Sequence, residues 1–102
     1  MPNTIPVAGR ILVVDDQPAN LRTLAVLLSR VGYEVATSAN GDDALAQAGE
    51  RITDLILLDM MMPGRDGFAV LAEIRQRPAL QDVPVVFLTA AQDRDLLLRA
   101  FD

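Results

Sequence analysis

The fold is decided by the stretch Asp54–Gly67, which reads DLILLDMMMPGRDG. The unbroken apolar run Leu55–Leu58 leads directly into Asp59, and Pro63 and two glycines follow. A short apolar run that ends in turn-forming residues is typical of a strand buried on both faces of a sheet. The sequence therefore predicts a strand that ends at Asp59, which places this carboxylate at the carboxyl edge of the sheet.

Strands and helices are expected to alternate on both sides of this stretch. Besides Leu55–Asp59, the expected strands are Arg10–Asp15, Tyr33–Thr37 and Pro84–Thr89. The expected helices are Pro18 to about Val31, Gly41–Glu50 capped by Asn40, Phe68–Arg77 and Asp93–Phe101. This alternation predicts an α/β protein with a flavodoxin-like three-layer sandwich and a parallel sheet in strand order 2-1-3-4.

Composition limits the class of protein. The 102 residues suit one domain, expected at 10–102 after a flexible lead-in at 1–9. A hydrophobic fraction of 51% allows a buried core, and the absence of cysteine excludes disulfides and is consistent with the cytoplasm. The net charge of −5 disfavours non-specific nucleic-acid binding, and no apolar run approaches the roughly 20 residues of a membrane span.

Oxygen-bearing side chains follow three of the predicted strands. Asp15 and Asp16 follow the first, Asp59 ends the third and Thr89 ends the fourth. Because the carboxyl ends of parallel strands meet at one edge, these groups are expected to lie together. Clustered carboxylates favour a cation, and an all-oxygen set suits Mg²⁺, with a backbone carbonyl near Met61 as a further ligand. Asp59 could then attack as a carboxylate nucleophile and form an acyl phosphate.

Each of these residues also has a structural interpretation. Asp15 and Asp16 could be helix N-caps, and Thr89 is an ordinary strand former. The methionines Met60–Met62 are expected to pack rather than to bind metal, because thioethers do not bind Mg²⁺. The combination of all these groups at fixed strand ends favours the functional interpretation.

Three motifs carry a family resemblance. They are Val13-Val14-Asp15-Asp16, Asp59-Met60-Met61-Met62-Pro63-Gly64-Arg65-Asp66-Gly67 and Leu88-Thr89-Ala90. From about Arg10 to Asp102 the chain resembles the receiver domain of bacterial two-component response regulators. The resemblance implies a phosphorelay signalling module, not a free-standing enzyme, with a fused or separate output domain.

The resemblance also implies a role for each site residue. Asp59 is the phosphoacceptor, which receives its phosphoryl group from a sensor histidine kinase or a phosphotransfer protein. Asp16 is the direct Mg²⁺ ligand, Asp15 assists through water, and the Met61 carbonyl completes the ligation by the protein. Thr89 is the switch hydroxyl that moves toward the phosphoryl group.

The sequence departs from the family at its end. The family places a lysine at the end of strand five, whereas all nine cationic residues here are arginines. The chain is expected to be truncated before strand five and helix five. An uncovered strand four presents bare backbone groups, so a homodimer through strand four or helix four is expected.

Two alternatives remain open. One is a degenerate receiver that serves only as a dimerisation or protein-docking module, without phosphotransfer; Mg²⁺-dependent binding of a phosphoryl mimic would separate it from an active receiver. The other is an aspartyl-phosphate phosphatase of the haloacid dehalogenase type. That class requires a second aspartate two residues after the nucleophile, where this chain has Met61.

Overall fold

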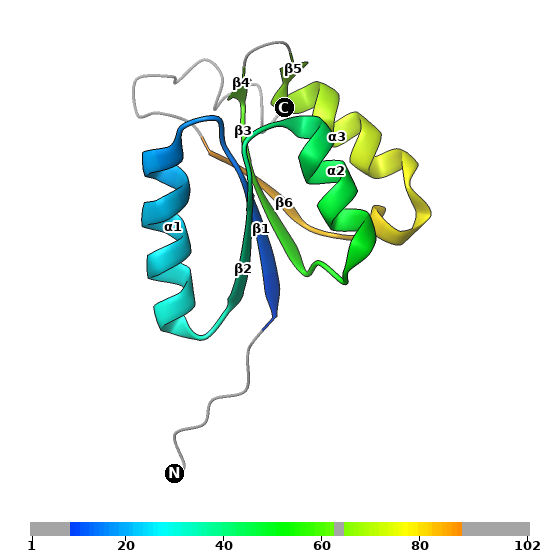
Figure 1. Ribbon diagram of the computed structural model, residues 1–102. Helices are drawn as coiled ribbons and strands as arrows, with labels where there is room; N and C mark the ends of the chain where they lie inside the picture. The colour runs from blue at the N-terminus through cyan, green and yellow to red at the C-terminus, as the bar shows by residue number, and fades with distance from the viewer. Residues whose placement is uncertain (1–8, 63–64, 89–102) are drawn as a thin grey trace.

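The computed structural model describes residues 9–62 and 65–88, which form a parallel sheet with helices on both faces (Figure 1). The strands of this sheet are β1 (Arg10–Val14), β2 (Glu34–Ser38), β3 (Leu55–Asp59) and β6 (Val85–Leu88). The helices are α1 (Pro18–Val31), α2 (Gly41–Glu50), α3 (Gly67–Gln76) and the 3-10 turn η1 (Pro78–Leu80). A short hairpin, β4 (Met61–Met62) and β5 (Arg65–Asp66), lies between β3 and α3.

The order of the strands is β2-β1-β3-β6, and all three neighbouring pairs are parallel. This confirms the predicted order 2-1-3-4. In register, Val14 lies opposite both Ser38 and Leu58, and Asp59 lies opposite Leu88. The carboxyl ends of β1, β3 and β6 therefore meet at one edge of the sheet.

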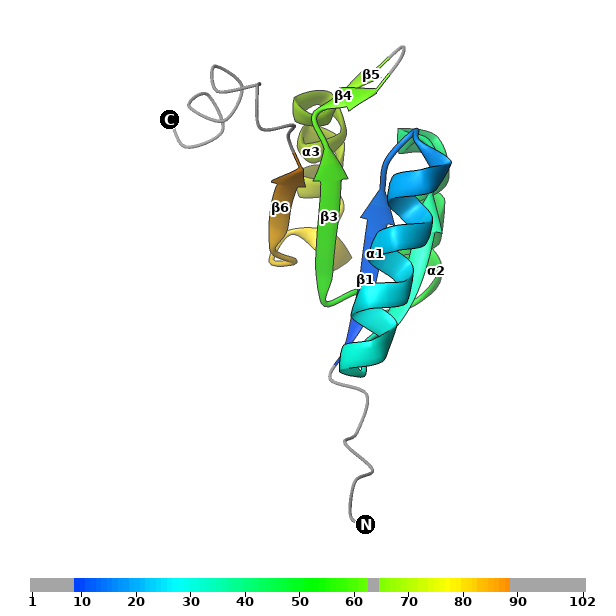
Figure 2. The same ribbon diagram turned by 90° about the vertical axis from the view of Figure 1, so that its left-hand side faces the viewer.

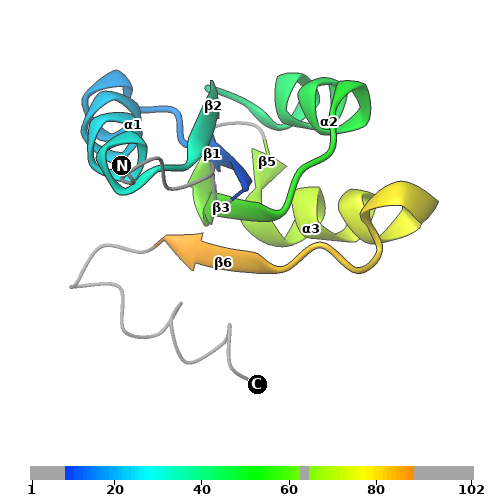
Figure 3. The same cartoon turned by 90° about the horizontal axis from the view of Figure 1, so that it is seen from below.

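Figure 3 shows the layers end-on, with α1 on one face of the sheet and α2 and α3 on the other. The main core lies on the side of α2 and α3. It includes alternate residues of the central strands and the inner faces of these helices: Leu12, Val14, Ile56, Leu58, Ala44, Leu45, Ala48, Val70 and Ile74. Since side chains alternate across a strand, the apolar runs of β1 and β3 can fill both faces at once.

The other face of the sheet carries α1. Helix α1 packs mainly against β1 and β2 (Figure 2) and has no fully buried residue. Its Leu21, Leu24 and Leu28 are half-buried, while Val31, which shares their spacing, is 62% exposed. None of the helices in the described ranges 9–62 and 65–88 is long and apolar enough to cross a bilayer.

The helix ends confirm several local predictions. Gly32 ends α1 in the left-handed region at φ 111°, which a residue with a Cβ rarely adopts. Asn40 caps α2, because its Oδ1 accepts the Asp43 N–H at 2.8 Å. Helix α3 begins at Gly67, one residue earlier than predicted, since Asp66 accepts the Ala69 N–H at 2.8 Å and serves as the cap.

Three predictions fall on residues that the structure does not describe. These are the lead-in over residues 1–8, the switch residue Thr89 and the helix predicted at Asp93–Phe101. The strand predicted at Pro84–Thr89 is present as β6, Val85–Leu88. The strand predicted at Tyr33–Thr37 is present one residue later, as Glu34–Ser38.

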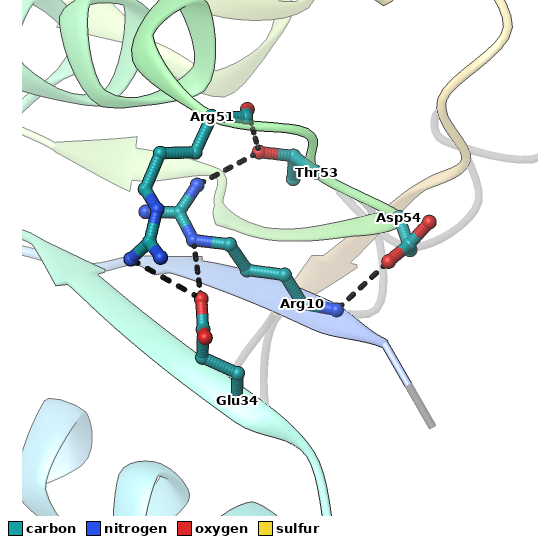
Figure 4. A network of polar contacts seen from close by, with 5 residues as sticks. All are labelled: Arg10, Glu34, Arg51, Thr53 and Asp54. Carbon is teal, nitrogen blue, oxygen red and sulfur yellow. Dashed lines mark hydrogen bonds and ion pairs between the residues drawn. The ribbon is translucent and has the colours of Figure 1, made fainter. Parts of the chain in front are cut away.

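A polar network ties together the amino-terminal edge of the sheet (Figure 4). The Arg10 guanidinium lies 3.1 Å from Glu34 and donates to the Thr53 hydroxyl at 3.2 Å. The Arg10 N–H donates to Asp54 at 2.8 Å. Arg51 reaches the same Glu34 oxygen at 3.4 Å. Arg10 thus links β1 to β2 and to the segment before β3, at the edge opposite the clustered carboxylates.

Candidate functional site

Three carboxylates converge at the carboxyl edge of the sheet. Asp15 and Asp16 follow β1, and Asp59 is the last residue of β3. One oxygen from each of the three side chains lies within 4.8 Å of the others. Strands β1 and β3 are direct neighbours in the sheet, so their ends bring these groups together. The expected proximity of the three acids is present, whereas Thr89 lies outside the described residues.

Asp15 is 4% exposed and is held through both of its carboxylate oxygens. Its Oδ1 accepts the Gln17 N–H at 2.9 Å, and its Oδ2 accepts the Asn20 side-chain amide at 3.1 Å. The N-cap position of α1 belongs to Gln17, whose side chain makes no capping bond. Neither Asp15 nor Asp16 is therefore the N-cap of α1, although Asp15 does accept two hydrogen bonds from residues at the start of this helix.

Asp59 and Asp16 are held less firmly. Asp59 Oδ1 accepts the Met61 N–H at 3.1 Å. Among the described groups, which do not include the Arg65 side chain, the Asp16 carboxylate has no hydrogen bond or ion pair, and Asp16 is partly exposed. The cluster thus combines one buried carboxylate, held through both of its oxygens, with two carboxylates that are partly exposed.

The pKa of Asp59 is raised from 3.8 to about 6. Burial is the main cause, the charges of Asp15 and Asp16 and a contact with the Asp15 side chain add to it, and the Met61 N–H opposes it. Burial and like charges both disfavour the ionised form. A bound cation would relieve this penalty, since it compensates the negative charge of all three groups.

The turn-forming segment that follows Asp59 contains two short antiparallel strands, β4 and β5. Met61 pairs with Asp66, and Met62 pairs with Arg65. Met60 and Met62 are buried at 1% and 8% exposure, in agreement with their predicted packing role, while Met61 is 61% exposed. Two-residue strands are too short to show a periodicity, but the Pro63-Gly64 pair was a usable turn signal.

Gly67 allows α3 to start directly against the end of β3. Its N–H donates to the Met60 carbonyl at 3.0 Å. A Cβ at this position would lie 3.0 Å from the Asp59 carbonyl oxygen and 3.0 Å from the Met60 Cα. The close approach favours glycine, because a Cβ would require these two backbone atoms to shift by a few tenths of an ångström.

Sequence reasoning missed one residue at this site, Asn20, which contacts Asp15 from the first turn of α1. An exposed asparagine in a helix has no distinctive pattern. The available signal was its poor helix propensity at a position that neither caps nor ends the helix.

Comparison with known proteins shows the family to which this chain belongs. The sequence profile described as response regulator receiver domain matches residues 11–102. The chain belongs to the response regulator receiver family. This receiver is therefore a signalling module of the two-component type.

Curated relatives agree with this assignment. The response regulator PleD of Caulobacter vibrioides is 47% identical over 87 residues, or 85% of this receiver and 19% of PleD. The transcriptional regulatory protein ResD of Bacillus subtilis is 41% identical over 93 residues, or 91% of this receiver and 38% of ResD. The chain thus spans well under half the length of either relative.

Solved structures share the fold. A putative response regulator from Chloroflexus aurantiacus superposes with a TM-score of 0.84 at 32% identity, over 91% of this receiver and 76% of that chain. The receiver domain of a signal transduction histidine kinase from Syntrophus aciditrophicus has a TM-score of 0.80 at 33% identity, over 93% of this receiver and 72% of that chain.

Proposed function

We propose that Asp59 accepts a phosphoryl group, in a Mg²⁺-dependent transfer, from a sensor histidine kinase or a phosphotransfer protein. The observation that carries this proposal is the convergence of Asp15, Asp16 and Asp59 within 4.8 Å at the end of the central strands. A nucleophilic carboxylate beside two further carboxylates is a poor phosphate acceptor without a cation and a good one with it.

The donor set fits Mg²⁺, which prefers oxygen ligands and retains several waters. Asp16 suits direct ligation because its carboxylate belongs to the cluster and is partly exposed. Asp15 suits ligation through water, since both of its oxygens already accept hydrogen bonds. The Met61 carbonyl is the proposed backbone ligand. When bound, Mg²⁺ would neutralise the cluster and the charge on the transferred oxygens.

The chemical step is a displacement at phosphorus. An oxygen of Asp59 attacks the phosphorus of a phosphohistidine, a new O–P bond forms and the N–P bond breaks. The electron pair of the broken bond remains on the imidazole of the donor. Since Asp59 Oδ1 accepts the Met61 N–H, Oδ2 is the oxygen proposed to attack. Thr89 is proposed to donate its hydroxyl to a phosphoryl oxygen afterwards.

Intact-mass spectrometry after incubation with Mg²⁺ and a small phosphodonor tests the proposal. We expect the mass of one phosphoryl group to be added, and we expect this adduct to be lost with a chelator or in Asp59→Asn. Asp82→Asn is the matched control, because Asp82 is an exposed aspartate outside the cluster. Phosphorylation that persists in Asp59→Asn, or that is unaffected by the chelator, would contradict Mg²⁺-dependent phosphorylation of Asp59.

The wider role of the receiver is also a proposal. The curated relatives are far longer than this chain, so we propose that a fused or separate output domain, in the cytoplasm, reads the signal. The net charge of −5 argues against direct nucleic-acid binding by the receiver.

The alternative is a docking or dimerisation module without phosphotransfer. It is favoured by β6, which is the edge strand among the described residues and carries Val86 at 50% exposure. Self-association through β6 would pair the backbone groups that no other described strand pairs. An unmodified mass with Mg²⁺ and phosphodonor, together with a dimer in sedimentation, would favour this alternative. A phosphorylated monomer would exclude it.

A further inference from the structure

We propose that Asn20 is a positioning residue, which fixes the Asp15 carboxylate in the orientation that the metal site requires. This inference rests on the proposed function, because it concerns the same acidic cluster. Its basis is the 3.1 Å hydrogen bond from Asn20 Nδ2 to Asp15 Oδ2. Asn20 itself would not touch the ion or the phosphoryl group.

The backbone places Asn20 where this contact is possible. Pro18 begins α1 directly after the N-cap residue Gln17, and the Asn20 N–H donates to the Gln17 carbonyl at 3.1 Å. Asn20 is thus the third residue of the helix. Side chains of a helix tilt toward its amino-terminus, so the amide of Asn20 reaches back toward the end of β1.

The two hydrogen bonds to Asp15 act together. The terminal torsion of an aspartate side chain is broad and roughly two-fold, so a single bond would leave the carboxylate plane loosely set. Gln17 N–H holds Oδ1 at 2.9 Å and Asn20 holds Oδ2 at 3.1 Å, which fixes the plane from both ends. The lone pairs of Asp15 that these donors leave free then have a defined direction in the cluster.

The residue type fits this role better than it fits the helix. Asparagine is a poor helix former, and Asn20 is exposed, so neither propensity nor core packing explains it. A cationic donor at this position would compete with the metal for the carboxylates, and a carboxylate would add a fourth negative charge. An amide donates a hydrogen bond without changing the charge of the cluster.

The test is the affinity of the protein for Mn²⁺, used as a paramagnetic substitute for Mg²⁺ and measured from the EPR signal of the free ion. Asn20→Ala removes the donor but improves helix propensity. We expect its dissociation constant to rise about tenfold, as is typical when the partner of a ligand is removed. We expect its melting temperature in chelator to stay equal or rise. Asn20→Gln, which keeps an amide, should recover most of the affinity.

Thr23→Leu, at an exposed position on the same helix, is the matched control and should bind Mn²⁺ as the parent protein does. In phosphorylation by a small phosphodonor, Asn20→Ala should need more Mg²⁺ for half-maximal rate and reach a similar rate at saturation.

Unchanged Mn²⁺ affinity in Asn20→Ala overturns the positioning role, while the proposed function stands if the parent protein binds the ion. A parent protein that binds no ion overturns both. If Asn20→Ala fails to fold, Asn20→Leu, which is of similar size and has no donor, provides the same comparison.

Discussion

The backbone of Gly67 lies against Asp59, the last residue of β3. A Cβ added to Gly67 would lie only 3.0 Å from the Asp59 carbonyl oxygen. The Gly67 N–H donates to the Met60 carbonyl at 3.0 Å, so the start of α3 is joined to the strand that carries the proposed phosphoacceptor. The position of Asp59 therefore depends on a residue eight positions later in the sequence.

Gly67→Ala should destabilise the receiver by about 1–3 kcal/mol, the usual cost of overpacking, because the added Cβ forces backbone atoms of Asp59 and Met60 to shift. The same substitution should slow the phosphorylation of Asp59. Gly49→Ala is the matched control: its nearest atom is 3.8 Å away, and alanine in the helix should stabilise by about 0.5–1 kcal/mol. Urea unfolding of both variants measures the contrast. Equal stabilities would show that β3 and α3 separate more easily than the structure indicates.

Asp59 makes stability depend on pH. Its pKa is raised from 3.8 to about 6, so between these values the folded receiver binds more protons than the unfolded chain. Stability should therefore fall as pH rises through this window. Asp59→Asn cannot ionise, so it should melt at a higher temperature than the parent above pH 6, and this difference should vanish below pH 3.8. A variant less stable than the parent at neutral pH would refute this account.

Mg²⁺ should also change the difference in melting temperature between the parent protein and Asp59→Asn. A ligand that binds only the folded state raises stability in proportion to the logarithm of its concentration. We expect added Mg²⁺ to raise the melting temperature of the parent protein more than that of Asp59→Asn. The same concentration of a monovalent salt serves as the control for ionic strength, and an equal rise in both proteins would argue against metal binding at the cluster.

The two arginines that contact Glu34, Arg10 and Arg51, should differ in how much they contribute to the free energy of unfolding. The Arg10 side chain is 11% exposed, whereas that of Arg51 is 64% exposed. Arg10→Ala should cost about 1–3 kcal/mol, since it leaves buried partners such as Thr53 without their donor. Arg51→Ala should cost less than about 1 kcal/mol, as is usual for an exposed ion pair. Denaturant unfolding tests both, and equal losses would contradict the role of burial.

Asn40 offers a test of local structure. Its side chain accepts the Asp43 N–H at 2.8 Å, and Asn40→Ala should cost about 1 kcal/mol of stability. Asn40→Gly should cost only a few tenths of a kcal/mol, as is usual for glycine at a helix N-cap. Chemical denaturation of the two variants gives the comparison, and an Asn40→Ala variant as stable as the parent would mean that water replaces the cap.

Much of the fold could be predicted because its signals are local. The apolar run Leu55–Leu58 identified β3, Gly32 identified the end of α1, and Asn40 identified the start of α2. The site could be predicted to the same extent, since Asp15, Asp16 and Asp59 each follow a strand whose neighbours were set by the strand order. The spacing of the three motifs predicted the family.

Contacts between distant segments could not be predicted. Arg10, for example, bonds to Thr53 across 43 positions. The bond from Asn20 to Asp15 is near in sequence but depends on the angle between β1 and α1. Local patterns specify which segments become strands and helices because backbone propensity and burial periodicity are properties of neighbouring residues. The orientation of each carboxylate depends on packing between segments, which no local pattern encodes.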